Sequence, residues 1–225
     1  MPMQYPRTKT QDLVEEIHGH AVPDPYRWME DLDSDELRGW IEAQNALTFG
    51  FLESSTLREK IQARMTALWN YEKYASPFKR AGRFFFSYNN GLQNQDVLYW
   101  LDDLNAEPQV LIDPNKLSED GTVALSGAVV SRDGRLLAYG ISDAGSDWQT
   151  WYVRRVDDGE DLADHISWVK FSSVSWDAEN KGFFYSRYDA PQGEALKQAN
   201  YFHKLYYHKL GTPQTEDRLV YERPD

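Results

Sequence analysis

Cysteine is absent from the 225-residue chain. This absence excludes disulfide bonds, thiolate metal sites and a cysteine nucleophile. Five histidines remain as possible metal ligands or general bases. A chain without cysteine also fits a reducing compartment, and the lack of a membrane-spanning run and of a secretory signal leads us to expect a cytoplasmic location.

Basic residues and long apolar runs are also scarce. The chain has 24 Lys and Arg against 36 Asp and Glu, a formal net charge of -12. This charge disfavours nucleic acid and anionic membranes as partners. No apolar run approaches the roughly 20 residues that cross a bilayer. The start of the chain, MPMQYPRTKTQDLVEE, lacks the apolar centre of a secretory signal. We therefore expect neither a nucleic-acid nor a membrane partner.

The hydrophobic content of 41% can fill a core, and the period of the apolar residues changes near residue 70. Prolines keep the first 25 residues extended or irregular. An apolar face then predicts a helix that ends near Gly50. Thr56 and Glu59 have the spacing of a capping box and predict a second helix. Its expected buried stripe consists of Leu57, Ile61, Met65 and Leu68.

From Tyr71 onward, short aromatic and β-branched runs separated by turn residues predict β-strands. The predicted strands are RFFFSY, VLYWLDDL, QVLID, LLAYGIS, TWYVRRV, GFFYSRY, KLYYHKL and RLVYE. Equivalent strands begin at Phe84, Leu136 and Phe183, which are 52 and 47 residues apart. Others are centred on Tyr99, Trp151 and Tyr206, which are 52 and 55 residues apart.

A repeat near 50 residues is typical of β-propeller blades, each read here as two aromatic strands followed by a third strand and a polar loop. Residues 71–225 would hold about three blades, fewer than a closed ring needs. The last blade would then expose an open edge through which the chain associates. A β-sandwich with irregularly spaced aromatic strands is the alternative.

Two patterns in the sequence are candidate metal sites. Asp31, Asp33 and Asp35 alternate as in a calcium loop, with Glu42 at the twelfth position, but Glu36 occupies the place of the required glycine. A helix start with favourable acids is the better interpretation. His18 and His20 lack a third ligand nearby and are expected to be exposed loop residues. We expect no metal and no cofactor.

Two catalytic patterns are equally uninformative. With 36 acidic residues, pairs of carboxylates suited to glycoside hydrolysis arise by chance. A serine nucleophile on a strand-to-helix elbow needs G-x-S-x-G, which does not occur. Ser146 in AGSDW is the nearest approach and lacks the second glycine. The residues by themselves therefore indicate no catalytic centre.

The stretch DPYRWMED at 24–31, with HGHAVP before it and EAQN after it, resembles the N-terminal signature of the prolyl oligopeptidase family of serine peptidases. The resemblance continues in order through LSEDGTVALS, AYGISDAGSDWQTWYV, VKFSSVSW and YHKLGTPQTED. It therefore covers the whole chain.

The resemblance implies a mainly β chain: about three blades of a seven-bladed propeller, preceded by a helical N-terminal segment that belongs to an α/β-hydrolase domain. Residues 1–70 would be this segment of the catalytic domain, and 71–225 the first blades. The Ser-Asp-His triad, the larger part of the hydrolase domain and the remaining blades would lie outside these residues. Tyr26 and Trp28 would be buried rings, and Arg27 or the acids of the stretch would make paired contacts to the hydrolase domain.

The implied reaction is hydrolysis of short peptides after proline, with this segment supplying the lid and substrate selection and no triad residue. Phe171 would offer an aromatic surface to a substrate residue upstream of the proline. Asp147 would belong to an ion-pair network that orients arginines near the substrate backbone. A core aromatic for Phe171 and a turn residue for Asp147 remain open.

Two other functions also remain open. The chain could be a short, non-catalytic binding module of the propeller type. It could also belong to a related oligopeptidase with a preference for basic residues. In the prolyl oligopeptidase interpretation, its partners are short proline-containing peptides, the hydrolase domain and the remaining blades.

Overall fold

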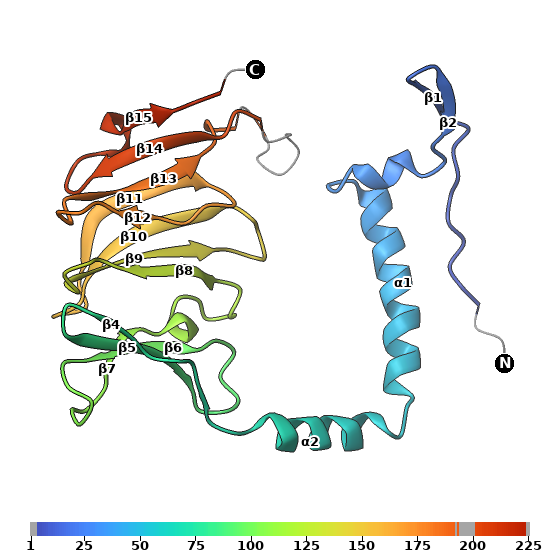
Figure 1. The fold of residues 1–225 in the computed structure, drawn as a ribbon. Coiled ribbons are helices and arrows are strands. Elements are labelled where there is room, and N and C mark those ends of the chain that lie inside the picture. The colour runs from blue at the N-terminus through green and yellow to red at the C-terminus, as the bar shows by residue number, and fades with distance from the viewer. Residues whose placement is uncertain (1–3, 192, 194–200, 224–225) are drawn as a thin grey trace. The chain divides into compact units, whose positions relative to one another are not determined.

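The computed structural model describes residues 4–191, 193 and 201–223 (Figure 1). The chain divides into two compact units, residues 1–68 and 69–225. In the first unit a hairpin precedes two helices. The elements are β1 (Val14–Ile17), β2 (His20–Pro23), the 3-10 helix η1 (Arg27–Glu30), α1 (Asp35–Glu53) and α2 (Arg58–Trp69). His18 and Gly19 form the hairpin turn with φ of 51° and 80°, the left-handed conformation that two-residue hairpin loops require.

The DPYRWMED stretch holds the first unit together locally. Trp28 is buried, as predicted, and its Nε1 donates a 3.0 Å hydrogen bond to the Lys9 carbonyl. Arg27 pairs with Asp24, at 2.6 Å from Nε to Oδ2, and with Glu15 on the hairpin. Tyr26 is 46% exposed within this chain, and its burial against the hydrolase domain stays a prediction.

Both helices depart from the predicted boundaries. Ser34 caps α1 by accepting the Leu37 N–H at 3.2 Å, and α1 runs through Gly50 to Glu53. The α2 helix begins at Arg58 rather than Thr56, and Ser55 takes the place of the expected cap by accepting the Leu57 N–H at 3.4 Å.

The predicted burial of the α2 stripe is wrong. Leu57, Ile61, Met65 and Leu68 are between 54% and 64% exposed. Helical periodicity identifies an apolar face, but burial also needs a surface to cover that face. Among the described residues of the first unit, only Trp28 and Leu37 are buried hydrophobic residues.

The second unit contains three antiparallel sheets, stacked in chain order (Figure 1). Sheet 1 comprises β3 (Lys73–Tyr74), β4 (Phe78–Arg80), β5 (Arg83–Asn89), β6 (Val97–Leu101) and β7 (Gln109–Ile112). Sheet 2 comprises β8 (Ala124–Val130), β9 (Leu136–Ser142), β10 (Gln149–Arg155) and β11 (Asp161–Val169). Sheet 3 comprises β12 (Ser175–Trp176), β13 (Gly182–Arg187), β14 (Lys204–Lys209) and β15 (Arg218–Tyr221). Short 3-10 helices η2 (Pro114–Lys116) and η3 (Gln214–Glu216) lie in the connections.

Each predicted aromatic run is a strand in the structure, but the expectation of three strands in each repeat is wrong. Sheets 2 and 3 have four strands each, and in sheet 1 the outer strand is split into β3 and β4, both paired with β5. The strands missed include β8 and β11, whose sequences ALSGAVV and DLADHISWV carry small and acidic residues. Their strand conformation depends on pairing with neighbours more than on local propensity.

Two apolar clusters hold the sheets together. One joins sheets 1 and 2 and contains Phe85, Trp100 and Leu137; the other joins sheets 2 and 3 and contains Trp151, Ile166 and Phe183. The face-to-face stacking of four-stranded antiparallel sheets is consistent with propeller blades. Within the part of the chain that the structure describes, neither helix is long and apolar enough to cross a membrane.

Candidate functional site

The two residues predicted to bind substrate come together at one end of sheet 2. Asp147 lies in the β9–β10 connection, and Phe171 lies just after β11. Lys170 stands between them: its Nζ is 3.8 Å from Asp147 Oδ2 and 5.3 Å from the centre of the Phe171 ring. Only 12% of the Lys170 side chain is exposed, whereas Phe171 is 68% exposed. Phe171 is therefore a surface ring and not a core aromatic.

Aromatic rings surround the Lys170 ammonium group. The Trp148 ring centre is 5.0 Å from Nζ, within the range of cation–π attraction. Trp148 in turn packs edge-on against Trp168 at 5.8 Å and against Tyr188 at 6.1 Å. We call this group the Lys170 cluster; its members are Asp147, Trp148, Trp168, Lys170, Phe171 and Tyr188.

The backbone around the cluster adopts left-handed conformations at residues other than glycine. Ala144, Trp168 and Phe171 have φ of 48°, 62° and 54°. Such a conformation costs about 1–2 kcal/mol for a residue with a Cβ atom. Strained backbone of this kind is concentrated at binding and active sites. An exposed ring on a strained loop is typical of a contact surface for a ligand.

A β-bulge places Trp168 in the cluster. In the β10–β11 ladder Gln149 pairs with Val169 and Trp151 with Ile166, so β11 carries one extra residue in this interval. The bulge falls at Ser167 and Trp168. Bulges re-aim side chains and are frequent beside active sites. Here the bulge coincides with the left-handed Trp168, whose ring packs on Trp148.

A buried polar network links sheet 3 to Asp164 on β11 of sheet 2. His208 Nδ1 is 2.6 Å from Asp217 Oδ1, and its Nε2 is 2.9 Å from Asp164 Oδ1. The Tyr185 hydroxyl donates to Asp217 Oδ2 at 2.5 Å, and the Gly211 N–H donates to Asp164 at 2.7 Å. All three charged side chains are no more than 2% exposed.

The network determines the protonation of its members. Burial disfavours the imidazolium, but hydrogen bonds to Asp164 and Asp217 outweigh burial and raise the pKa of His208 to about 9. Burial likewise disfavours the carboxylate, yet the bonds from His208 and the Gly211 amide lower the pKa of Asp164. His208 is therefore a cation between two carboxylates at neutral pH.

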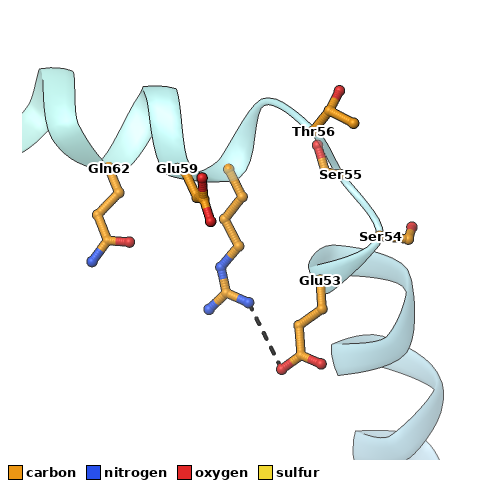
Figure 2. Close-up of a pocket in the computed structure, with 7 residues that line it drawn as sticks. Glu53, Ser54, Ser55, Thr56, Glu59 and Gln62 are labelled. Atoms are coloured by element: carbon orange, nitrogen blue, oxygen red, sulfur yellow. Dashed lines mark ion pairs between the residues drawn. The ribbon is translucent and has the colours of Figure 1, made fainter.

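A surface hollow of about 610 Å³ lies where α1 meets α2 (Figure 2). It is lined by Glu53, Ser54, Ser55, Thr56, Arg58, Glu59 and Gln62. Every one of these side chains is exposed, and the only ion pair drawn there, Arg58 Nη1 to Glu53 Oε1, spans 3.9 Å. The hollow offers no buried polar group with which to orient a ligand.

The other residues considered in the sequence as metal ligands or nucleophiles lie in turns or at a helix start. His18 and His20 are exposed at the β1–β2 hairpin. Ser146 Oγ accepts the Trp148 N–H at 3.1 Å, so this serine shapes the turn that carries Trp148. Asp35 lies in the first turn of α1 and pairs with Arg38. Over residues 4–191, 193 and 201–223, no group of three histidine or acidic residues could hold a metal ion.

Sequence reasoning missed Trp148, Trp168, Lys170 and Tyr188. Two of these flank the predicted residues directly, in the stretches GSDW and WVKFSS. Trp148 directly follows Asp147 and Lys170 directly precedes Phe171, and these neighbours were a usable signal. The contact between the two stretches was not visible, because Asp147 and Lys170 lie in different connections.

The stacked antiparallel sheets are consistent with the blades of a propeller-type domain. Residues 5–225 match the family "Prolyl oligopeptidase, N-terminal beta-propeller domain". The chain belongs to the prolyl oligopeptidase family.

Several relatives are similar along nearly the whole chain. The prolyl endopeptidase of Elizabethkingia meningoseptica is 38% identical over 219 residues, which are 97% of this chain and 31% of that protein. Prolyl oligopeptidase A of Amanita bisporigera is 37% identical over 253 residues, covering 98% of this chain and 33% of that protein. The chain thus spans about a third of the length of these relatives.

Solved structures agree with these matches. A structure from a study of two prolyl endopeptidases has a TM-score of 0.91 at 33% identity, covering 98% of this chain and 33% of that one. Prolyl oligopeptidase B from Galerina marginata, bound to a 35mer hydrolysis and macrocyclization substrate, has a TM-score of 0.88 at 31% identity, covering 100% of this chain and 35% of that one.

Proposed function

We propose that this chain is the N-terminal part of a serine endopeptidase that hydrolyses short peptides after proline. In this proposal residues 71–225 are the first blades of a seven-bladed propeller lid, and the Lys170 cluster binds the substrate upstream of the proline. One observation carries the assignment of the cluster: Lys170 lies against both Asp147 and Phe171, which come from separate connections.

The same proposal assigns residues 1–70 to the hydrolase domain of that peptidase. Unit 1 supports this assignment, because its buried hydrophobic residues among those described are only Trp28 and Leu37. Its exposed apolar side chains include Ile41, Phe49, Phe51, Ile61 and Met65. A segment of this size cannot stabilise itself with so small a core and is expected to pack on a larger domain.

The roles within the cluster follow from exposure and charge. The exposed Phe171 ring presents an apolar face to a substrate side chain, which stabilises binding in proportion to the area it covers. Asp147, 62% exposed and only 3.8 Å from Lys170 Nζ, retains oxygen atoms free to meet an arginine of the hydrolase domain. Cytoplasmic location stays a prediction.

The test is the substitution Phe171→Ala in the peptidase that contains these residues. We expect KM for a fluorogenic peptide with an apolar residue upstream of proline to rise about tenfold, as loss of a partly buried ring contact of about 1.4 kcal/mol implies. The value of kcat should change little, because the ring contacts substrate away from the scissile bond.

The matched control is Leu104→Ala, which removes a side chain with the same 68% exposure in the β6–β7 connection of sheet 1. KM of this variant should equal that of the unsubstituted enzyme. An unchanged KM in Phe171→Ala, with every peptide tried, would remove the cluster from the substrate site. The 225-residue chain by itself, which lacks a G-x-S-x-G elbow, should cleave none of these peptides.

A further inference from the structure

The Gln214 side chain binds both backbone polar groups of Ser167, a residue in another sheet. Its Oε1 accepts the Ser167 N–H at 3.0 Å, and its Nε2 donates to the Ser167 carbonyl at 3.0 Å. Gln214 begins η3, in the β14–β15 connection of sheet 3, whereas Ser167 lies in β11 of sheet 2. One carboxamide thus reproduces the pair of hydrogen bonds that two residues exchange in an antiparallel ladder.

The Ser167 backbone groups bound in this way belong to the β11 bulge. A bulge interrupts the ladder and leaves peptide groups without a strand partner, which is costly away from water. Gln214 supplies both missing partners at Ser167, and the Tyr188 N–H donates to the carbonyl of the next residue, Trp168, at 3.1 Å. Two residues outside sheet 2 therefore fix the bulge from which Trp168 projects onto Trp148.

Gln214 is itself held by the buried network. Its Nε2 also donates to the Tyr185 hydroxyl at 3.2 Å, and Tyr185 donates to Asp217, which binds His208. The carboxamide consequently has one orientation, with its oxygen toward the Ser167 N–H. A group oriented by its neighbours holds the peptide it binds more rigidly than a free side chain does.

We propose that Gln214 is a positioning residue for the substrate-binding surface. Its two hydrogen bonds to the Ser167 backbone, which we call the clamp, fix the β11 bulge. Through Trp168 and Trp148, the bulge in turn places Lys170 and Phe171. The effect on substrate rests on the function proposed above, whereas the placement of Trp168 does not. Gln214 touches no substrate in this proposal and acts through the bulge.

Two substitutions separate the clamp from general packing. Gln214→Leu removes both hydrogen bonds. Gln214→Glu keeps an acceptor for the Ser167 N–H, but as a carboxylate it places a second oxygen against the Ser167 carbonyl. A protonated Glu side chain regains a donor at that position. Thr215→Ala, at the exposed neighbour in η3, is the control.

The first measurement uses the 225-residue chain labelled with 5-fluorotryptophan, with the Trp168 resonance assigned by Trp168→Phe. We expect Gln214→Leu to displace the Trp168 and Trp148 resonances and to reduce hydrogen-exchange protection of the Ser167 amide by about 10-fold or more, as loss of a net bond of about 1.4 kcal/mol implies. In Gln214→Glu the displacement should be present at pH 7.5 and reverse as the pH falls toward 5. Thr215→Ala should match the unsubstituted chain.

The return of the Trp168 resonance in Gln214→Glu at low pH is the decisive readout, because protonation would not reverse a loss of packing alone. This readout can be used even if Gln214→Leu does not fold. A Trp168 resonance of Gln214→Glu that equals the unsubstituted one at both pH values would overturn the clamp.

The second measurement is KM of the peptidase that contains these residues. Gln214→Leu should raise KM at least threefold with a smaller change in kcat. If Trp168 moves and Phe171→Ala raises KM, but Gln214→Leu leaves KM unchanged, the positioning role is overturned. If Phe171→Ala also leaves KM unchanged, the function proposed for the cluster fails while the clamp, tested by NMR, stands.

Discussion

Replacing His208 by glutamine is expected to lower the free energy of unfolding by about 3–5 kcal/mol, the cost of removing one partner from a buried charged network. The substitution leaves Asp164 and Asp217 buried without the cation that lies 2.9 Å and 2.6 Å from them. A glutamine has one amide donor group and no charge, so it cannot compensate both carboxylates. Urea denaturation of the 225-residue chain and of the variant measures the difference.

The matched control is His165→Gln. His165 lies next to Asp164 in β11, but its side chain is exposed. We expect a change within about 0.5 kcal/mol, as for other surface substitutions. Equal losses in the two variants would show that the buried network contributes nothing beyond the loss of a histidine.

The network also determines how stability varies with pH. Folding raises the pKa of His208 from its ordinary 6.5 to about 9. Below pH 6.5 the side chain is charged in both states and its contribution is complete. Between 6.5 and about 9 the folded protein keeps a proton that the unfolded chain releases, so stability falls as the pH rises. Asp164, with its lowered pKa, acts in the opposite sense and loses its contribution as the pH falls below its ordinary 3.8.

The urea midpoint should therefore decline between pH 6.5 and 9, and this decline should disappear in His208→Gln. A parallel decline in the variant would assign the alkaline dependence to other groups.

Replacing Trp151 by alanine is expected to cost about 3–5 kcal/mol, because it opens a cavity in the core. Trp151 in β10 is 1% exposed and belongs to the cluster that joins sheets 2 and 3. Two glycines make room for its indole, Gly140 on the adjacent strand β9 and Gly127 on the next strand β8: a Cβ atom at either would lie 2.7 Å from the ring. The ring thus occupies space that β8 and β9 leave for it.

A double-mutant cycle with Gly127→Ala, where the three nearest atoms to the added Cβ all belong to Trp151, tests this fit. Alone, the added methyl group should destabilise by about 1–3 kcal/mol through overpacking against the indole. In the Trp151→Ala background it should cost much less, because the clashing ring is gone. Strictly additive losses would contradict the proposed packing. Trp69→Ala, at an indole 65% exposed, should cost no more than about 1 kcal/mol.

Much of the second unit could be predicted from local pattern. Runs such as GRFFFSY and KLYYHKL combine β-branched or aromatic residues with flanking turns, and both are strands in the structure. Strands without that composition, such as β8, were missed because pairing with neighbours determines their conformation. In the first unit a second helix was correctly predicted, but whether its apolar residues are buried depends on a covering surface that a helical period does not specify.

The candidate site was predictable only residue by residue. Asp147 and Phe171 were named through resemblance, and nothing in their local sequence placed both against Lys170. The clamp between Gln214 and Ser167 spans 47 positions and was not foreseen. Neither residue type nor spacing signals such a contact, because a carboxamide is compatible with solvent as well as with a peptide partner.

The sequence by itself determined the absence of thiol chemistry, the β-rich repeat after residue 70 and the family resemblance, because composition, period and motif are local properties of the chain. Only the tertiary structure decided which side chains are buried and which meet: the exposed Phe171, the screened Lys170, the charged His208 and the bulge that Gln214 holds. Burial and hydrogen bonding depend on distances between residues remote along the chain, and those distances exist only once the sheets have stacked.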